Sequence, residues 1–390
     1  MKYGKSSTPE ELKINNKIDI KSGTDLSEDF DAEGGAILIE KSNPNIRHCL
    51  ISNNVAAFSG GGIAIKNYSN PKILYCQIIN NIALIWSGGG INCFNYSNPL
   101  IENCNITNNS AENLGGGINI QNYCSPLIYG CIIDRNLAGD RGGGICFYTS
   151  AKPIVQNSSI SGNTSPLGGG IYIDEFYNKF REQPGKFAIR ITDVRIDNNS
   201  AEYGGGIWLR DTQGELSGVT ISNNRAMIGG GVHIEHNPAY FQFSSEHLCN
   251  VYMNFAQIMG NDFFRLGGGN TMTFPLDTFT VKYYSALNVE PIWNFILDIK
   301  NFKLTQVNAD LYVNPIGDDS NSGLSSSEPL KSLKIAFLKI LADSTSPRII
   351  YMDEGEYIFS ETNDVLMLSK HKYVSLKGSG LLRLYSVQIG

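Results

Sequence analysis

Three consecutive glycines followed by an apolar segment recur along most of this chain. The copy at residues 114–120 reads LGGGINI, a weaker copy at 33–39 reads EGGAILI, and the other clear copies end at Ile65, Cys93, Phe147, Ile173, Leu209 and Ile234. Most successive copies lie 25 to 28 residues apart, one interval is 36 residues, and a further weak copy at Gly269 follows after 38 residues. Repeats of nearly fixed length are typical of solenoid proteins, so this spacing constrains the fold more than any other feature.

The remainder of each repeat also follows a common pattern. At residues 98–111 it reads NPLIENCNITNNSA, in which short apolar stretches, such as Leu100–Ile101 and Ile106, are separated by polar residues. Apolar residues in alternation, many of them β-branched, indicate short strands, and no helical period is present. Each repeat of about 27 residues therefore predicts one coil of a β-solenoid, with strands of successive coils about 4.8 Å apart.

Asparagine recurs at one fixed position of the repeat. The residues at this position are Asn54, Asn81, Asn109, Asn136, Asn163, Asn199 and Asn224. Identical residues at the same phase of stacked coils lie above one another, so we predict an inward ladder in which each amide bonds to its neighbour. The glycines are predicted to form a corner where neighbouring coils leave no room for a Cβ atom or where φ is positive.

These units resemble repeats of known proteins. The GGGI and xIxNNxA units are similar to the GGAI and FxxN repeats of chlamydial polymorphic outer membrane proteins, although ISNN at 51–54 has Ile where that family has Phe. The chain also looks like a pectin-lyase-type protein over roughly residues 33–274. The resemblance implies an all-β fold, a right-handed parallel β-helix. It implies no single activity, because this fold hosts lyases, hydrolases, adhesins and passive stalks.

Changes in the repeat pattern divide the chain into four segments. We predict an N-terminal segment at 1–32, β-helix repeats at 33–274, a terminal cover or linker at 275–308 and a C-terminal segment at 309–390. The last segment resembles the uncharacterised domain that opens many bacterial β-helix proteins, in which a helix caps the first coil. It is predicted to begin a second β-helix, with Pro329 in the first turn of a helix whose apolar face contains Leu330, Leu333, Phe337, Ile340 and Leu341.

The two ends of the sequence indicate a piece of a longer protein. Residues 1–17 lack the apolar core of a signal peptide, and the chain stops at Gly390 soon after the second β-helix is predicted to begin. We therefore expect a fragment of an exported protein with truncated ends. A complete two-domain protein is the alternative.

Composition argues against several classes of function. The chain has 31 basic and 37 acidic residues, a net charge of −6 and no dense Lys/Arg patch, so we expect no nucleic-acid partner. No apolar run reaches about 18 residues, so we expect no transmembrane segment. The eight cysteines form no CxxC pair and have no His partner at zinc spacing, so we predict no metal site and no cofactor.

Four cysteines share one inward phase of the repeat: Cys49, Cys76, Cys104 and Cys131. The same phase is occupied later by Val194 and Val219, so we predict a stack of free thiols in the core rather than disulfides. Cys146, by contrast, falls at a position predicted to face outward. The segment GDDSNSG at 317–323 looks like a calcium loop but lacks EF-hand spacing, so a turn is expected there.

The strand after each glycine corner supplies the candidate binding residues. Its second and fourth residues are predicted to face outward, which would place aromatic rings beside charged groups in several successive coils. The candidate glycan-binding residues are Tyr148, Tyr172, Asp174, Trp208, Arg210, His233 and Glu235. Exposed aromatics beside charged groups suit a sugar-binding surface, and the partner would be a cell-surface or environmental polysaccharide. The alternative is a cross-strand charge ladder beside aromatics that merely suit β-strands.

Catalysis by the same residues can be weighed from their spacing. Asp174 and Glu235 lie two coils apart, about 9.6 Å between backbones, near the roughly 6.5–9.5 Å that separates the carboxyl groups of inverting hydrolases. Arg210 falls between them and is expected to lower the pKa of both, which a general acid does not tolerate. We therefore predict no catalytic residues. The expected function is a secreted or cell-surface stalk, adhesin-like or glycan-binding protein, and a polysaccharide lyase or glycoside hydrolase of the same fold is the alternative.

Overall fold

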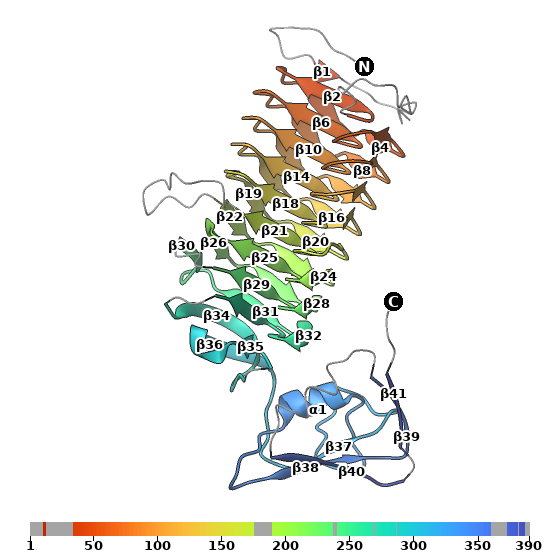
Figure 1. The fold of residues 1–390 in the computed structure, drawn as a ribbon, viewed down its shortest axis with the longest axis vertical. Coiled ribbons are helices and arrows are strands. Elements are labelled where there is room, and N and C mark those ends of the chain that lie inside the picture. Colours follow the sequence, from red (N-terminus) through yellow and green to blue (C-terminus); the bar gives the residue numbers. More distant parts are fainter. Residues whose placement is uncertain are drawn as a thin grey trace.

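Parallel strands stack along one axis through most of the chain (Figure 1). The computed structural model describes residues 11–12, 34–174, 189–236, 240–267, 270–285, 287–359, 373–380 and 382–386. Within these residues a regular coil passes through sheet 1, sheet 2, sheet 3 and a short sheet 4, and neighbouring coils pair in parallel. The prediction of an all-β parallel β-helix with coils of about 27 residues is confirmed.

Sheet 1 contains the strands that follow the glycine corners. In spatial order they are β2 (Ile37–Glu40), β6 (Ile63–Lys66), β10 (Ile91–Phe94), β14 (Ile118–Gln121), β18 (Ile145–Tyr148), β21 (Ile171–Asp174), β25 (Ile207–Arg210), β29 (Val232–Glu235), β33 (Phe263–Leu266) and β35 (Val289–Glu290).

Sheet 2 follows sheet 1 within each coil. In spatial order its strands are β1 (Glu11–Leu12), β3 (Asn45–Arg47), β7 (Lys72–Leu74), β11 (Leu100–Glu102), β15 (Leu127–Tyr129), β19 (Ile154–Gln156), β22 (Ile189–Thr192), β26 (Gln213–Ser217) and β30 (Tyr240–Phe243). Apart from β1, the predicted N-terminal segment at 1–32 lies outside the described residues.

Sheet 3 comes next, two residues after sheet 2 in a regular coil. Its strands are β4 (Leu50–Ser52), β8 (Gln77–Ile79), β12 (Asn105–Thr107), β16 (Ile132–Asp134), β20 (Ser159–Ser161), β23 (Arg195–Asp197), β27 (Thr220–Ser222), β31 (Cys249–Tyr252), β34 (Met272–Val281) and β36 (Phe295–Leu304). Sheet 4 has two parts, made of β5 (Val55–Ala56), β9 (Ile82–Ala83), β13 (Ser110–Ala111) and β17 (Leu137–Ala138), and of β24 (Ser200–Tyr203), β28 (Arg225–Ile228) and β32 (Phe255–Met259).

The core is a set of side-chain ladders that run along the axis. Ile63 pairs in register with Ile91, which pairs with Ile118, and all three are fully buried. The inward residues of sheets 2 and 3, such as Ile101 and Ile106, are fully buried as well. Because β-branched side chains pack well on a pleated surface, one alternating pattern suffices to fill every coil.

The asparagine ladder is confirmed. Asn109 donates from Nδ2 to Oδ1 of Asn136 at 3.0 Å and to the carbonyl of Ile78 at 2.8 Å. Its own Oδ1 accepts hydrogen bonds from the backbone and side-chain nitrogens of Asn81, both at 3.0 Å. The ladder continues beyond the predicted residues to Asn254, whose Nδ2 donates to Asp262 at 3.1 Å.

The glycine corners also behave as predicted. Gly115 has a φ of +63°, in the left-handed region that favours glycine. A Cβ atom on Gly116 would lie 2.4 Å from the carbonyl oxygen of Leu137, and one on Gly117 would lie 2.6 Å from that of Gly144, both in the next coil. The first glycine therefore supplies the backbone conformation, and the other two permit the close approach of the coils.

The last coils of the solenoid have an aromatic core. Phe263 lies 5.2 Å from Phe274 and 5.8 Å from Phe295, measured between ring centroids. The two longest strands, β34 and β36, pair along sheet 3 at this end, and the 3-10 helix η1 (Ile292–Asn294) leads into β36.

The C-terminal segment pairs a short helix with further parallel strands (Figure 1). Its strands are β37 (Leu311–Val313), β38 (Arg348–Met352), β39 (Gly355–Phe359), β40 (Val374–Gly378) and β41 (Leu382–Ser386). β38 pairs with β40 and β39 with β41, so partners lie about 26 to 27 residues apart. A second β-helix beginning here stays a prediction.

The helix α1 (Leu333–Lys339) is shorter than predicted. Ser332 caps it by accepting a hydrogen bond from the backbone nitrogen of Ile335, so Pro329 lies before the helix and not in its first turn. Leu330 forms a bridge with Val313 in place of a helical turn. Ile340 and Leu341 lie beyond the last helical residue.

The C-terminal segment and the end of the solenoid share an apolar cluster. Leu333 and Phe337 of α1 belong to the same cluster as Phe255 and Val281 of the last coils. Lys334 places its ammonium nitrogen 3.8 Å from the ring centroid of Phe255. In the described part of the chain, no helix has the length and apolar character needed to cross a membrane.

The loop at 317–323 is held as a turn. Asp319 accepts hydrogen bonds from the backbone nitrogens of Lys331 and Ser332, at 3.0 and 2.7 Å, and Lys339 donates to the carbonyls of Asn321 and Ser322. These contacts satisfy the loop without an ion. Within the described ranges, no group of three or more His, Cys, Asp or Glu side chains is arranged to hold a metal ion.

The cysteine prediction is confirmed for the inward stack. Cys49, Cys76, Cys104 and Cys131 are buried and free. Each thiol donates to a nearby backbone carbonyl, as Cys76 does to Leu74 at 3.3 Å. Val194 and Val219 continue the buried phase, which agrees with the interpretation of a small apolar core position.

Candidate functional site

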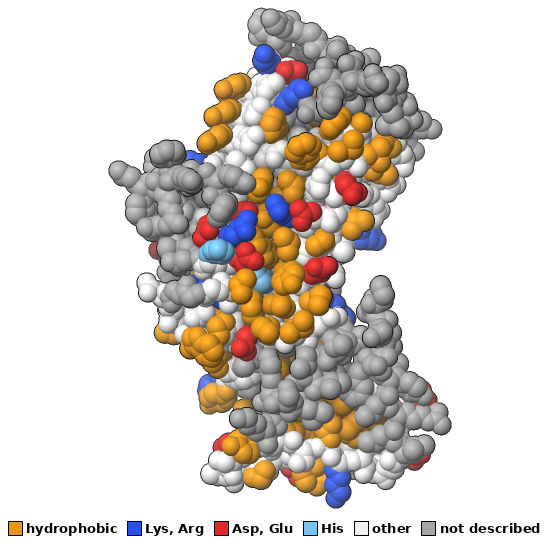
Figure 2. Space-filling model, viewed as in Figure 1, with side chains coloured by type: hydrophobic (Ala, Val, Ile, Leu, Met, Phe, Trp, Pro, Cys, Tyr) orange, Lys and Arg blue, Asp and Glu red, His pale blue; other side chains and the backbone are white. Residues whose placement is uncertain are grey.

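Three neighbouring strands of sheet 1 bring the predicted site residues together. The register pairs Tyr172 of β21 with Trp208 of β25, and Trp208 with His233 of β29. The same pairings place Asp174, Arg210 and Glu235 in a second row, and Tyr148 of β18 lies opposite Asp174. Figure 2 shows charged side chains gathered around hydrophobic ones near the middle of this face. We call these seven residues the sheet 1 strip.

The second residue of each strand is not exposed, contrary to the sequence prediction. Tyr172, Trp208 and His233 are 0%, 2% and 1% exposed, and Cys146 in the same row is 0% exposed. The Tyr172 and Trp208 rings stack with centroids 4.6 Å apart and an angle of 7° between their planes. These rings therefore pack against the protein, and the Trp208 ring has no open face on which a sugar could stack.

The glycine corner explains this burial. The first glycine of each triplet turns the chain back over the outer face of sheet 1. A Cβ atom on Gly204 would lie 2.8 Å from Cβ of Trp208, and Gly142 approaches Cys146 equally closely. The residue before the triplet then covers the row, as Leu114 and Tyr203 do. Strand alternation predicts which side chains point away from the core. It does not predict which of these side chains are covered by other parts of the chain.

The charged row is a continuous ion-pair network. Arg210 donates from Nη2 to Oδ2 of Asp174 at 2.5 Å and from Nε to Oδ1 at 3.3 Å. Its Nη1 lies 3.6 Å from Oε2 of Glu235. Tyr172 donates its hydroxyl to Asp174 at 2.9 Å, and the guanidinium of Arg210 lies 5.3 Å from the Trp208 ring centroid. This geometry matches the alternative of a cross-strand charge ladder.

Burial is the largest cause of the pKa shift of two groups in the strip. The pKa of Glu235 is raised, because the cost of burying its charge exceeds the lowering by Arg210. Arg210 does lower the pKa of Glu235, as expected, but the net shift is upward because burial has the larger effect. Burial also lowers the pKa of His233 to about 4, so its imidazole is neutral at pH 7.

Arg141 belongs to the same site and was not predicted from the sequence. Its guanidinium lies 5.7 Å from the Tyr148 ring centroid and 5.4 Å from that of Tyr172, and its Nε lies 3.1 Å from Asp140. The signal was its place directly before a glycine triplet, in RGGGI. That is the position from which side chains cover the outer face of sheet 1.

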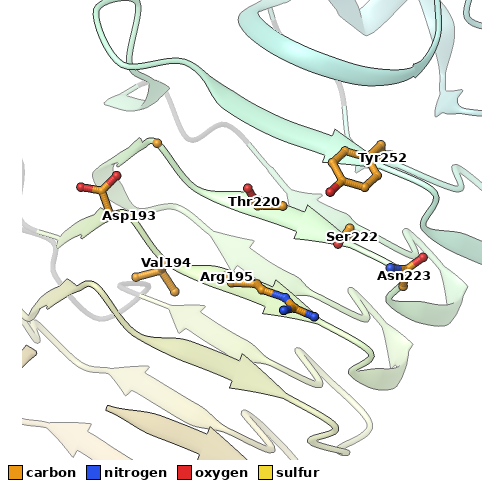
Figure 3. Close-up of a pocket in the computed structure, with 8 residues that line it drawn as sticks. Asp193, Val194, Arg195, Thr220, Ser222, Asn223 and Tyr252 are labelled. Atoms are coloured by element: carbon orange, nitrogen blue, oxygen red, sulfur yellow. The ribbon is translucent and has the colours of Figure 1, made fainter. Parts of the chain in front are cut away.

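A second candidate site lies on sheet 3 and was not predicted. It is a groove of about 500 Å³, which we call the sheet 3 groove (Figure 3). Its lining residues are Asp193, Val194, Arg195, Gly218, Thr220, Ser222, Asn223 and Tyr252.

Small side chains on one coil create this groove. Thr220 lies in register with Arg195 of the preceding coil, and Ser222 lies in register with Tyr252 of the following coil. Figure 3 shows Arg195 and Tyr252 on opposite sides of Thr220 and Ser222. Gly218 lines the groove at one end. The sequence signal was the run of small polar residues in SGVTIS, which could be recognised only by comparison with the larger residues of adjacent coils.

The charged groups that line the sheet 3 groove are paired. Arg195 donates from Nη2 to Oδ2 of Asp197 at 2.6 Å. Asp193 lies 3.4 Å from Nε2 of His247. The groove therefore offers hydroxyl, amide and phenol groups between the Arg195–Asp197 ion pair and the Asp193–His247 contact.

Comparison with known proteins places the chain in a family. The family model described as right handed beta helix region matches residues 13–113 and 85–246, which together span more than half of the chain. The chain belongs to this family. No curated protein and no solved structure matches it.

Proposed function

We propose that this protein acts outside the cell or on its surface, as a rigid β-helix stalk whose side binds polysaccharide without cleaving it. The observation that carries the proposal is the row formed by Asp174, Arg210 and Glu235. It presents Arg210 and Glu235, which are partly exposed, on the outer face of sheet 1, and Arg210 engages both carboxyl groups that hydrolysis would require.

The ladders support the stalk role. Each asparagine bonds to the next coil, and each glycine corner contacts the next corner, so neighbouring coils are joined on several sides. Bending such a rod would break several of these contacts at once. The similarity of the GGGI and xIxNNxA units to repeats of polymorphic outer membrane proteins supports a surface location.

Within this proposal, the residues of the sheet 1 strip have two roles. Tyr148, Arg210 and Glu235 are partly exposed and would touch the polysaccharide. The other four, Tyr172, Asp174, Trp208 and His233, are buried and would hold these groups in place.

Binding and turnover can be measured on the same samples. The wild type should bind at least one polysaccharide on an array without releasing reducing ends or unsaturated uronides. Glu235→Gln should weaken binding several-fold, because it removes a charge at the exposed edge of the strip. Glu215→Gln on sheet 2 is the matched control and should bind as the wild type does. Antibody labelling of intact source cells tests the location, and a wild type that binds no polysaccharide would end the proposal.

A polysaccharide lyase or hydrolase is the second candidate, favoured by one observation. The raised pKa of Glu235 is a property that a general acid needs. Asp174 counts against this candidate, because it is buried and bonded to Arg210 and Tyr172. Release of sugar products by the wild type, abolished in Glu235→Gln, would make the protein an enzyme.

A further inference from the structure

We infer that the sheet 3 groove binds a short segment of a neutral, hydroxyl-rich polysaccharide lying across the solenoid axis. This inference rests on the proposed function, since it assumes that the solenoid binds polysaccharide. It adds a second site on a different sheet from the sheet 1 strip and states the chemical class of its ligand.

The direction of the ligand follows from the shape of the groove. The floor is a single coil, from Gly218 through Thr220 and Ser222 to Asn223, with larger side chains on the coils before and after it. Six residues of extended chain span at most about 17 Å. A ligand in this groove therefore runs along β27 and perpendicular to the solenoid axis, and it has the length of a short oligosaccharide.

The polar groups favour a sugar over a peptide. Backbone groups of β27 are paired with β23 on one side and β31 on the other, so they are not available to an extended peptide. What the groove offers is the exposed amide of Asn223 and the hydroxyl of Thr220, which accepts from Nδ2 of Asn250 at 3.2 Å and can still donate, while Ser222 forms a buried part of the floor. Sugar hydroxyls both donate and accept, so they can satisfy such groups in either direction.

The charges favour a neutral sugar. Arg195 already has an opposite charge close by, at 2.6 Å in Asp197, and Asp193 is itself a carboxylate, with Nε2 of His247 3.4 Å away. The whole chain has a net charge of −6, which disfavours the approach of a polyanion. A polysaccharide with carboxylate or sulfate groups would gain little from such pairs and would still lose part of its hydration.

Tyr252 supplies the aromatic surface of the groove. The ammonium of Lys303 lies 4.3 Å from the ring centroid, and it comes from β36, on the side of β31 away from β27. The part of the ring that lines the groove faces the other way, toward Thr220 and Ser222 (Figure 3). A sugar ring in the groove can therefore pack against Tyr252 while its hydroxyls bond to the floor.

The test is affinity electrophoresis through gels that contain dextran, xylan, hydroxyethylcellulose, polygalacturonate or alginate. Thr220→Trp fills the groove and should weaken retardation by a neutral polysaccharide at least tenfold. Tyr252→Ala should weaken it several-fold, whereas Tyr252→Phe keeps the ring and should stay within about twofold of the wild type. Ser159→Trp is the matched control, because Ser159 lies in the same row of sheet 3 two coils earlier.

The outcomes separate this inference from the proposed function. Binding that survives Thr220→Trp and Tyr252→Ala but is weakened by Glu235→Gln would overturn the groove and leave the proposed function standing. Retardation of the wild type by polygalacturonate or alginate alone would overturn the neutral class. Wild-type protein that none of the gels retards would overturn both. Unchanged melting temperatures of the variants ensure that a loss of binding is not a loss of fold.

Discussion

The outer faces of sheets 1 and 3 arise from the same repeat, yet one is covered and the other is open. On sheet 1, Trp208 is 2% exposed although it points away from the core. On sheet 3, the outward row of Arg195 is open, with the Arg195 side chain 65% exposed, although Asp197 in the second outward row is 1% exposed. The difference lies in the turns. A glycine triplet folds the chain back over sheet 1, whereas single left-handed residues such as Gly218 and Asn223 turn the chain at the ends of β27.

This difference determines what each face can do. A covered outer row becomes a second small core, made here of Leu114, Cys146, Tyr172 and Trp208. Its aromatics stabilise the coils and position the charged residues beside them. An open row keeps its side chains available, so a change in their size from coil to coil produces a groove. The predictions below test this contrast, from the largest expected effect to the smallest.

Trp208→Ala should destabilise the protein by about 3–5 kcal/mol, the usual cost of removing a large aromatic from a core. Tyr252→Ala, on the open face, should cost less than about 1 kcal/mol because the ring is partly exposed. Urea denaturation followed by circular dichroism measures both. Equal midpoints for the two variants would mean that the outer face of sheet 1 is not covered.

His233 should make stability depend on pH. Burial lowers its pKa to about 4 in the folded state, while its ordinary value is 6.5. The unfolded chain therefore binds a proton at a higher pH than the folded one, and stability is lost as pH falls from about 6.5 to 4, by roughly 3 kcal/mol at most.

The control for this pH effect is His233→Phe, because the next coil has Phe264 at the same position. This variant should lose less stability than the wild type between pH 7 and pH 4, in denaturation curves recorded at each pH. Identical pH profiles would show that His233 is accessible to protons and that the row is open.

Gly204→Ala and Gly218→Ala compare the two kinds of turn. Both residues have positive φ, at +68° and +63°, so both variants carry similar backbone strain of about 1–2 kcal/mol. On Gly204 the new Cβ would meet the backbone of Ile207 at 2.5 Å, which cannot move aside. On Gly218 it would meet the side chain of His247, which can.

Gly204→Ala should therefore cost about 1–3 kcal/mol more than Gly218→Ala, the usual penalty of overpacking. Thermal denaturation measures the difference. A larger loss of stability in Gly218→Ala than in Gly204→Ala would show that the turn at sheet 3 is the more rigid of the two.

The sequence predicted the solenoid well because the repeat itself carries that information. The spacing of the triplets fixes the coil length, and the phases of Asn109 and Cys104 identify inward positions that recur in neighbouring coils. The pairing of Tyr172 with Trp208 and of Asp174 with Arg210 followed from the same register. A feature that recurs in every coil can be recognised from the sequence by its fixed position in the repeat.

What the sequence did not predict depends on contacts outside the repeat pattern. The burial of Trp208 depends on where Gly204 and Tyr203 place the chain above it, and strand alternation contains no such information. The sheet 3 groove depends on a size difference between residues about 25 to 30 positions apart, such as Ser222 and Tyr252. The raised pKa of Glu235 depends on burial in the folded chain.

Asn109→Ala and Asn119→Ala should show the smallest contrast, between the inward ladder and the covered outer row. Asn109 makes four hydrogen bonds through its side chain. Asn119 is the second residue of its strand, a position predicted to face outward, but it is 0% exposed. Its Nδ2 donates to Oδ1 of Asn92 at 2.8 Å, and its Oδ1 has no partner among the described residues. Alanine at 109 leaves donors and acceptors unpaired in two neighbouring coils and should cost about 2–3 kcal/mol of stability, whereas alanine at 119 removes one hydrogen bond and should cost about 1 kcal/mol.

Denaturation midpoints of the two variants, measured under the same conditions, test this contrast. A cost at Asn119 below about 0.5 kcal/mol, as for a surface residue, would mean that the cover over sheet 1 opens in solution, and the contrast between the two faces would then disappear.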